Sequence, residues 1–237
     1  MKKMTKFFAL ALLAGAMVSC STEDTAPSVQ NDKVAVQFTG GISVNTRAAG
    51  VAWADGDKIG IFMTEAGKTL SADVIKEDVD NVCYQSNGSI AFSPISGGKT
   101  IFFPIDGDVD FYSYYPQTTV NDYKVALDVT DQTKQETIDF MYAKTEGCNK
   151  ATPQVDLKFF HKLSNLILDV QPGNGLTQED LKKMTVTVKG QNTKATFNLV
   201  DGTISGEGNP TDIMMKTTEV GKLYEAILLP TEEASRV

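Results

Sequence analysis

Apolar and polar residues alternate with a period of two along most of this chain, a pattern typical of half-buried β-strands. The alternation is clear at residues 34–38 and 155–159, and aromatic runs at 100–104 and 109–116 each end in proline. Proline cannot donate a hydrogen bond to a sheet ladder, so these runs predict strands that end there or lie at an edge. Asn87-Gly88, between two further apolar runs, predicts a hairpin because this pair accepts the positive φ angles of a type I′ turn.

One helical signal interrupts the strands. Thr177 can cap a short helix, with Asp180 three residues later and Leu181 and Met184 on one face. Many short strands with turns every eight to twelve residues or so indicate an all-β chain built from antiparallel β-sandwiches. The length of 237 residues favours two sandwich domains over one.

The chain is expected to comprise four segments. Residues 1–19 form a signal peptide, 20–32 a polar tether, 33–170 an N-terminal sandwich domain and 171–237 a C-terminal sandwich domain. The boundary is placed near 165–175, where proline and glycine at 171–175 give the strongest linker signal.

The first twenty residues have the layout of an export signal. Basic residues in the first six positions precede an apolar stretch at 7–18 that is too short to span a membrane comfortably. Val18-Ser19-Cys20 resembles the lipobox of bacterial lipoproteins, with Met17 where leucine is more usual. The resemblance implies cleavage before Cys20 and attachment of lipid to that cysteine. The alternative is an ordinary signal peptide that is cut near Cys20 without lipidation.

Charge and composition exclude several classes of function. The formal net charge is −8, and lysine and arginine do not cluster, whereas a nucleic-acid partner requires clustered basic side chains. The chain has one histidine and three cysteines, which excludes most metal sites and most histidine-based catalytic schemes. We therefore predict no nucleic-acid partner, no metal and no cofactor.

The single histidine is predicted to be structural. His161 lies among Phe159, Phe160 and Leu163, and the chain has no G-x-S-x-G motif that would supply a nucleophile. A packed, hydrogen-bonded histidine on a strand is the interpretation that the neighbours favour.

Three aspartates are spaced like the start of a calcium loop. They are Asp106, Asp108 and Asp110, but Phe111 and Gln117 stand where such a loop requires glycine and glutamate. The pattern therefore predicts a solvated turn between strands.

The aromatic run at 111–115 has two interpretations. Phe111, Tyr112, Tyr114 and Tyr115 could form a contact surface for a sugar or a protein, or they could be core residues. Alternation along a strand sends half of them to each face, so half are predicted to be core.

Two cysteines remain once Cys20 is assigned to lipid. Cys83 and Cys148 would lie in a compartment that permits disulfides, so they could pair. They could equally be two buried or half-buried thiols, and the sequence leaves both alternatives open.

Arg47 lies in a stretch of small residues at 45–51, between two predicted strands. Exposed loops of this kind are where proteases cut. Taken on composition alone, an ordinary surface arginine is the favoured interpretation.

A family resemblance changes that weighting. It is carried by the order and spacing of Phe38-Thr39-Gly40-Gly41-Ile42, Thr46-Arg47-Ala48, Trp53-Ala54-Asp55-Gly56-Asp57-Lys58-Ile59-Gly60-Ile61, Ile101-Phe102-Phe103-Pro104, Val109-Asp110-Phe111-Tyr112-Ser113-Tyr114-Tyr115-Pro116, Asp139-Phe140-Met141-Tyr142-Ala143 and Leu157-Lys158-Phe159-Phe160-His161-Lys162-Leu163-Ser164. Together these segments resemble the fimbrillin family, the pilin-like and adhesin-like surface lipoproteins of Gram-negative anaerobes that build type V pili.

The resemblance implies a two-domain, transthyretin-like β-sandwich protein without catalytic residues. It also implies cleavage after Arg47 by a trypsin-like protease, which makes Ala48 the new N-terminus. The cut would release the strand that carries Val34, Val36 and Phe38, and a strand from another subunit would then refill the vacated slot. Head-to-tail filling does not close on itself and so produces a fibre.

The implied function is a structural or accessory subunit, at the tip or the anchor, of a type V pilus that supports adhesion. Its partners would be other pilus subunits, the processing protease and the outer membrane, which it would reach through lipid on Cys20. It would be surface-exposed on the outer membrane, or in the extracellular fimbrium after processing. The alternative is a stand-alone surface lipoprotein that binds a glycan or a host protein. The sequence stops at 230–237, where a further strand should begin, so the C-terminal domain is expected to be truncated and to lack its donor strand.

Overall fold

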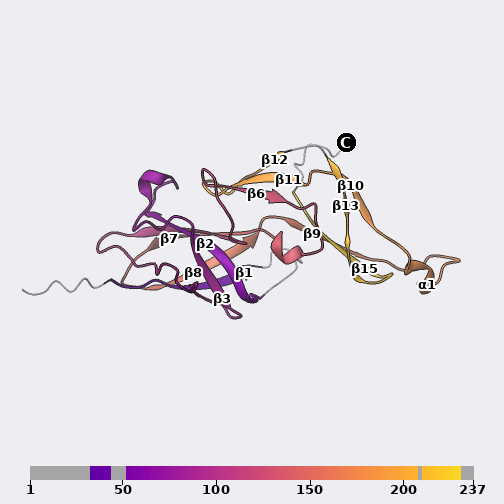
Figure 1. The fold of residues 1–237 in the computed structure, drawn as a ribbon, viewed down its shortest axis with the longest axis horizontal. Coiled ribbons are helices and arrows are strands. Elements are labelled where there is room, and N and C mark those ends of the chain that lie inside the picture. The colour runs from indigo at the N-terminus through magenta and orange to yellow at the C-terminus, as the bar shows by residue number, and fades with distance from the viewer. Residues whose placement is uncertain (1–32, 44–51, 208–209, 231–237) are drawn as a thin grey trace, which may run out of the picture. The chain divides into compact units, whose positions relative to one another are not determined.

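The computed structural model describes residues 33–43, 52–207 and 210–230 (Figure 1). All of the described residues belong to one compact unit. Its strands are β1 (Gln37–Ser43), β2 (Asp55–Glu65), β3 (Val82–Asn87), β4 (Ala91–Pro94), β5 (Val109–Tyr115), β6 (Lys124–Asp128), β7 (Met141–Cys148), β8 (Gln154–His161), β9 (Ser164–Asp169), β10 (Thr187–Gln191), β11 (Lys194–Asn198), β12 (Ile204–Glu207), β13 (Thr211–Met214), β14 (Lys216–Glu219) and β15 (Leu223–Leu228). Its helices are the 3₁₀ turns η1 (Ala72–Val74) and η2 (Gln135–Thr137) and the α-helix α1 (Gln178–Leu181). The all-β prediction is confirmed.

Seven strands form a sheet that closes into a barrel in the order β1-β4-β3-β2-β5-β7-β8. Strand β1 closes it, because β1 pairs with β4 on one side and with β8 on the other. The β1–β8 pair is parallel, so the expectation of purely antiparallel sheets is wrong at this point. Alternation predicts a strand but not the direction in which it pairs. Strands β1 and β8 are more than a hundred residues apart, so no hairpin joins them and they can pair in parallel.

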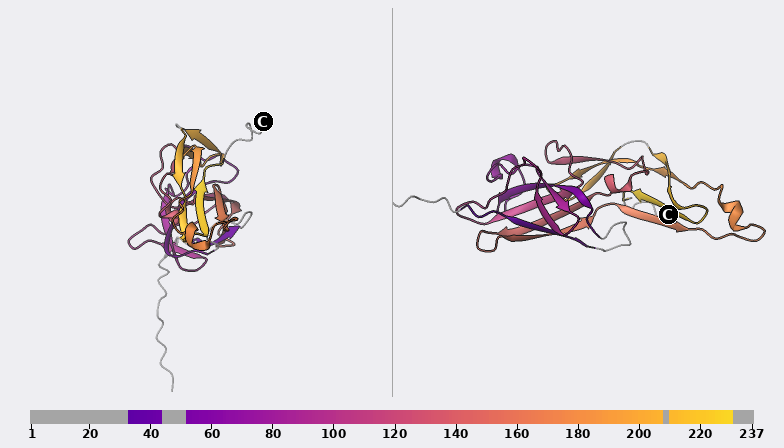
Figure 2. Two further views of the ribbon diagram at one scale, coloured as in Figure 1. Left: turned by 90° about the vertical axis from the view of Figure 1, so that its right-hand side faces the viewer. Right: turned by 60° about the horizontal axis from the view of Figure 1, so that its bottom comes forward.

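The remaining strands form three smaller sheets, whose later strands, β10 to β15, are drawn in orange and yellow in Figure 2. Their orders are β12-β11-β6, β14-β15-β9 and β10-β13. Strands β6 and β9 pair with β11 and β15, which follow them by many residues. The division into sandwich domains at residue 170 stays a prediction.

Two hydrophobic cores lie against opposite faces of the same strands. The first, called the barrel core, comprises Val36, Phe38, Trp53, Ile59, Ile61, Met63, Val79, Tyr84, Phe92, Ile101, Phe103, Val109, Phe111, Tyr115, Met141, Ala143, Val155, Leu157 and Phe159. The second core includes Phe62, Tyr112, Tyr114, Phe140 and Tyr142 together with side chains of the smaller sheets, such as Phe197 and Tyr224.

Strand β5 is buried along its whole length. Phe111 and Tyr115 belong to the barrel core, whereas Tyr112 and Tyr114 belong to the second core. The core interpretation of the aromatic run is therefore confirmed, and it holds for all four rings rather than half of them, because β5 has a packed layer on each face. These rings do not offer a contact surface for a sugar or a protein.

The short helix forms where its capping signal predicts. In α1 the Asp180 carboxylate accepts hydrogen bonds from the Thr177 backbone N–H (2.8 Å) and hydroxyl (2.6 Å), and these bonds lower the pKa of Asp180. Leu181 is buried. Across the described ranges, the helices are too short or too polar to cross a membrane.

Candidate functional site: the slot of strand β1

Strand β1 is held on both sides by strands that lie far away in the sequence. It pairs with β8 from Gln37 to Ser43, but with β4 over only two residue pairs. Upstream of β1, the Val36 N–H donates to the Ile101 carbonyl (3.0 Å). The Val34 carbonyl in turn accepts from the N–H of Phe103 (2.9 Å). The segment from residue 34 to 43 thus occupies a slot whose walls are β8, β4 and residues 101–103.

The inner face of this segment is apolar and packed. Val36 is 6% exposed and Phe38 is 2% exposed, and Val34 is half-buried against the same core. The Phe38 ring meets Tyr84 and Phe111 edge to face, at centroid distances of 5.3 and 5.1 Å. This geometry is the favourable one for aromatic pairs, so Phe38 contributes both buried area and specific ring contacts.

Trp53 contacts the same segment from outside the strand. Its indole N–H donates to the backbone carbonyl of Gly40 at 2.7 Å, in a buried position. The Trp53 ring also meets Phe92 and Phe159 edge to face, at 5.0 and 5.1 Å. Trp53 therefore binds the main chain of β1 while its ring is held by the two neighbouring strands.

Next to β1 lies a cavity of about 390 Å³. It opens between β1 and β4, where the two strands share few pairs, and Tyr84, Phe92 and Thr100 are among its lining residues. The Tyr84 hydroxyl accepts a hydrogen bond from the Ile101 N–H (2.8 Å) at the side of the slot. The seam between β1 and β4 is therefore less tightly closed than the seam between β1 and β8.

A polar contact lies on the outer face of the β1–β8 seam. The Thr39 hydroxyl donates to the Asp156 carboxylate, which also accepts from the Gln154 side-chain amide at 3.1 Å. These bonds lower the pKa of Asp156, chiefly the one from Thr39. The contact fixes which residue of β8 faces Thr39.

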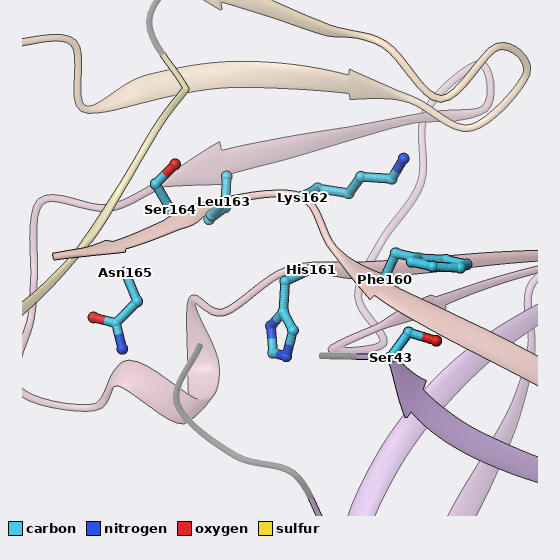
Figure 3. A pocket seen from close by; sticks show the side chains of 7 residues that line it. All are labelled: Ser43, Phe160, His161, Lys162, Leu163, Ser164 and Asn165. Carbon is cyan, nitrogen blue, oxygen red and sulfur yellow. The ribbon is translucent and has the colours of Figure 1, made fainter. Parts of the chain in front are cut away.

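A second cavity, of about 290 Å³, lies at the other end of β1 (Figure 3). Figure 3 shows His161 and Asn165 on one side of the chain and Leu163 and Ser164 on the other. His161 is bound to the Asp139 carboxylate through Nδ1 at 2.8 Å, and its side chain is 6% exposed. The prediction of a packed, hydrogen-bonded histidine is confirmed.

A family comparison assigns the chain. The sequence model of a family described as "Fimbrillin-like" matches residues 46–237, which is most of the chain. The chain belongs to the fimbrillin-like family. This family consists of fimbrial and adhesion structural proteins, which confirms the prediction that the protein is not an enzyme.

Individual relatives of this fimbrillin-like chain agree with the assignment. A Bacteroides uniformis protein named "Putative fimbrium subunit Fim1C" is 36% identical over 230 residues, which cover 93% of this chain and 73% of the relative. The crystal structure of a "putative cell adhesion protein" from B. uniformis has a TM-score of 0.71 at 32% identity and covers 87% of this chain and 78% of that chain. A similarly described protein from B. ovatus gives a TM-score of 0.64 at 25% identity, with coverages of 84% and 79%.

Some of the predicted site residues of this fimbrillin-like chain lie outside the described residues. They are Cys20, the predicted lipidation site, and Arg47 and Ala48, the predicted processing site. The structure places Val36 and Phe38 in the barrel core and Val34 against it.

Both remaining cysteines are free thiols. Burial raises the pKa of Cys83, and the positive charge of Lys58 opposes that effect. Burial, with Asp110 and Asp108 adding to it, raises the pKa of Cys148 to about 11. Of the two alternatives for this pair, the described structure has the half-buried thiols.

The aspartate turn is solvated only in part. Asp106 and Asp108 are exposed, but Asp110 is 1% exposed, so the prediction is wrong for this residue. Its carboxylate accepts hydrogen bonds from the backbone N–H groups of Gly67 and Gly147, both at 2.8 Å. Because Asp110 lies on the fully buried strand β5, it turns inward to bind two loops. Among the described residues, no group of three or more metal-binding side chains could hold an ion.

Sequence reasoning did not link Trp53 to Gly40. In the fold the two residues meet through the hydrogen bond that holds β1. The signals available were that Trp53 is the single tryptophan of the chain and that Gly40 interrupts an otherwise apolar strand face. Neither signal indicates that the two residues form a hydrogen bond with each other.

Proposed function

We propose that this chain is a subunit of a fimbrium and that it assembles by strand exchange at the β1 slot. Cleavage after Arg47 disconnects the segment that contains β1 from the rest of the chain. The freed segment leaves, and a β-strand of another subunit enters between β4 and β8. Repetition of this step from subunit to subunit builds a filament, and a subunit without a donor strand occupies its tip or its anchor.

The observation that carries the proposal is the position of β1 in both sequence and sheet. In the sheet β1 is a closing strand with partners on both sides. In the sequence it precedes Arg47, so one cut leaves β1 held by non-covalent contacts alone. The β8 ladder, the 101–103 segment and Trp53 all belong to the part of the chain that follows the cut.

The energetics support exchange rather than simple loss. Burial of the Val36 and Phe38 side chains contributes roughly 1.5–3 kcal/mol each. Removal of β1 also leaves unpaired backbone groups on β8 and β4, which are costly unless another strand binds them. Since a domain has only about 5–15 kcal/mol of stability, an empty slot has a strong tendency to be refilled.

The export route completes the proposal. Lipid on Cys20 tethers the uncut subunit to the outer membrane, and cleavage after Arg47 by a trypsin-like protease frees it from that tether. The protein is thus surface-exposed on the outer membrane before processing and in the extracellular fimbrium afterwards. The transthyretin-like sandwich, with a boundary near residue 170, is the domain plan that accompanies this route.

Arginine content allows a clean test. The chain has two arginines, Arg47 and Arg236, so an arginine-specific protease can cut the purified full chain only after these positions. Arg47→Lys keeps the charge and removes the site, and Arg236→Lys is the matched control. We expect a labelled peptide of residues 33–47 to bind the cut wild-type chain and the cut Arg236→Lys chain but not the protease-treated Arg47→Lys chain.

Mass spectrometry of outer-membrane material provides the cellular test. A mature N-terminus at Ala48 in the fimbrial fraction supports the proposal. Failure of the labelled peptide to bind the cut chain would contradict strand exchange, and an intact N-terminus at Cys20 in every fraction would contradict cleavage after Arg47.

A further inference from the structure

The β1 slot has one position where no side chain fits. A Cβ atom added to Gly40 would lie 2.7 Å from Cε2 of Phe92 and 3.3 Å from Cε2 of Phe159. The first distance is well inside van der Waals contact, so one of the groups would have to move. Gly40 is buried and lies on the same inner face as Phe38, two residues earlier.

Phe92 is held in place on the side that faces Trp53. It is 5% exposed, and its ring meets Trp53 edge to face at 5.0 Å. Trp53 is in turn packed against Phe159 and hydrogen-bonded to the Gly40 carbonyl. The three rings therefore hold one another over the one inward-facing position of β1 that lacks a side chain.

The neighbouring positions of the slot do admit side chains. Phe38 fills the space between Tyr84 and Phe111, and Ile42 packs against the barrel core two residues after Gly40. On the outward face, a Cβ added to Gly41 would meet nothing within 4 Å. The restriction thus belongs to one register position of the slot and not to the whole strand.

We propose that Trp53, Phe92 and Phe159 select the register and sequence of the strand that occupies this slot. This inference rests on the proposed strand exchange. The incoming strand must have glycine at the position of Gly40, with an aromatic side chain two residues before it and an aliphatic one two residues after it. A slip of two residues in either direction would place a large side chain under the rings, so the same contact also fixes the register. The Trp53 N–H binds only a backbone carbonyl at this position. Any strand in the correct register supplies that carbonyl, so this hydrogen bond does not depend on the side chains of the strand.

Competition between peptides for the arginine-cut chain tests the inference. We expect a peptide of residues 33–47 with Gly40→Val to bind at least about tenfold more weakly than the wild-type peptide, because overpacking a filled core is costly. The matched peptide with Gly41→Val should bind within about threefold of wild type. If the wild-type and both variant peptides bind equally well, the selection is refuted while the exchange stands. If no peptide binds, the exchange itself is refuted, and the selection with it.

A compensating change in the receptor separates steric selection from a general loss of strand quality. Phe92→Leu in the cut chain should narrow the difference in affinity between the Gly40→Val and Gly41→Val peptides. Circular dichroism of the Phe92→Leu chain checks that it is folded. If the weak binding of the Gly40→Val peptide persists unchanged on this folded receptor, the rings do not act as proposed.

Discussion

The barrel core and the second core use opposite faces of the same strands, yet they are closed in different ways. The barrel core is completed by β1, one strand near the N-terminus that precedes Arg47. The second core is covered by the three smaller sheets, whose strands come from the interior and the last third of the described chain. Only the barrel core can therefore be opened by one cut near the N-terminus.

The contrast shows how a stable protein can hold an exchangeable part. Strand β5 packs Phe111 into one core and Tyr112 into the other, so the wall between the cores has side chains in contact on both faces. That wall does not depend on β1 for the burial of its second face. Removal of β1 should therefore damage one core and leave the other as a folded support.

The largest effect is expected when one buried phenylalanine is truncated in each of the two cores. Phe38→Ala in the barrel core and Phe197→Ala in the second core should each lower the free energy of unfolding by about 3–5 kcal/mol. Both side chains are almost fully buried, at 2% and 0% exposure. Urea denaturation of the uncut chains measures this loss.

The two variants should differ once the chain is cut after Arg47. The N-terminal segment should dissociate faster from the Phe38→Ala chain than from the Phe197→Ala chain, as size-exclusion chromatography with mass spectrometry would show. Equal retention of the segment by both variants would mean that the cores are not independent.

A smaller effect is expected at the buried carboxylate of β5. Asp110→Asn replaces one of the two oxygens that accept from Gly67 and Gly147 with a group that cannot accept. Hydrogen bonds to a charged group are worth about 1.5–3 kcal/mol, so the free energy of unfolding should fall by about that amount. Asp106→Asn, at an exposed position of the same turn, is the control and should stay within about 0.5 kcal/mol of wild type. A similar loss in both variants would show that charge, not the buried contact, is what matters.

Trp53→Phe should weaken the hold on β1 without opening the core widely. The change keeps an aromatic ring but removes the N–H that donates to the Gly40 carbonyl, and an unpaired buried acceptor costs about 1–3 kcal/mol. Because the lost bond is to the backbone, binding of the wild-type and Gly41→Val strand peptides to the cut chain should weaken by the same factor. A competition assay with both peptides measures this, and a sequence-dependent loss would contradict it.

The sequence predicts local features of these regions better than their partners. Alternation at 34–38 correctly placed Val36 and Phe38 in a core, since burial of one strand face is a local pattern. The parallel partner β8 was missed because direction and long-range pairing leave no local trace. Full burial of β5 was missed for the same reason, because alternation describes one covered face and the second cover comes from distant strands. The rings around Gly40 come from three separate segments, so no spacing rule could have assembled them.

The smallest effect concerns the thiol next to the barrel core. The pKa of Cys148 is raised from 9.0 to about 11, chiefly by burial, so in the folded chain this group keeps its proton to higher pH than in the unfolded chain. Below pH 9 both states hold the proton, and the group adds no pH dependence. Between pH 9 and about 11 the unfolded chain ionises first and binds fewer protons, so the free energy of unfolding must fall as the pH rises.

Lysine and tyrosine side chains also titrate in this range, so the difference between wild type and Cys148→Ala isolates the thiol. The free energy of unfolding should fall less steeply between pH 9 and 10.5 in Cys148→Ala than in wild type, as urea denaturation would measure. Cys83→Ala should change the slope less, because the charge of Lys58 opposes the effect of burial there. Equal slopes in wild type and Cys148→Ala would mean that the edge of the barrel core near β7 is open to water. That result would weaken the contrast between the tightly packed strands that the two cores share and the single exchangeable strand β1.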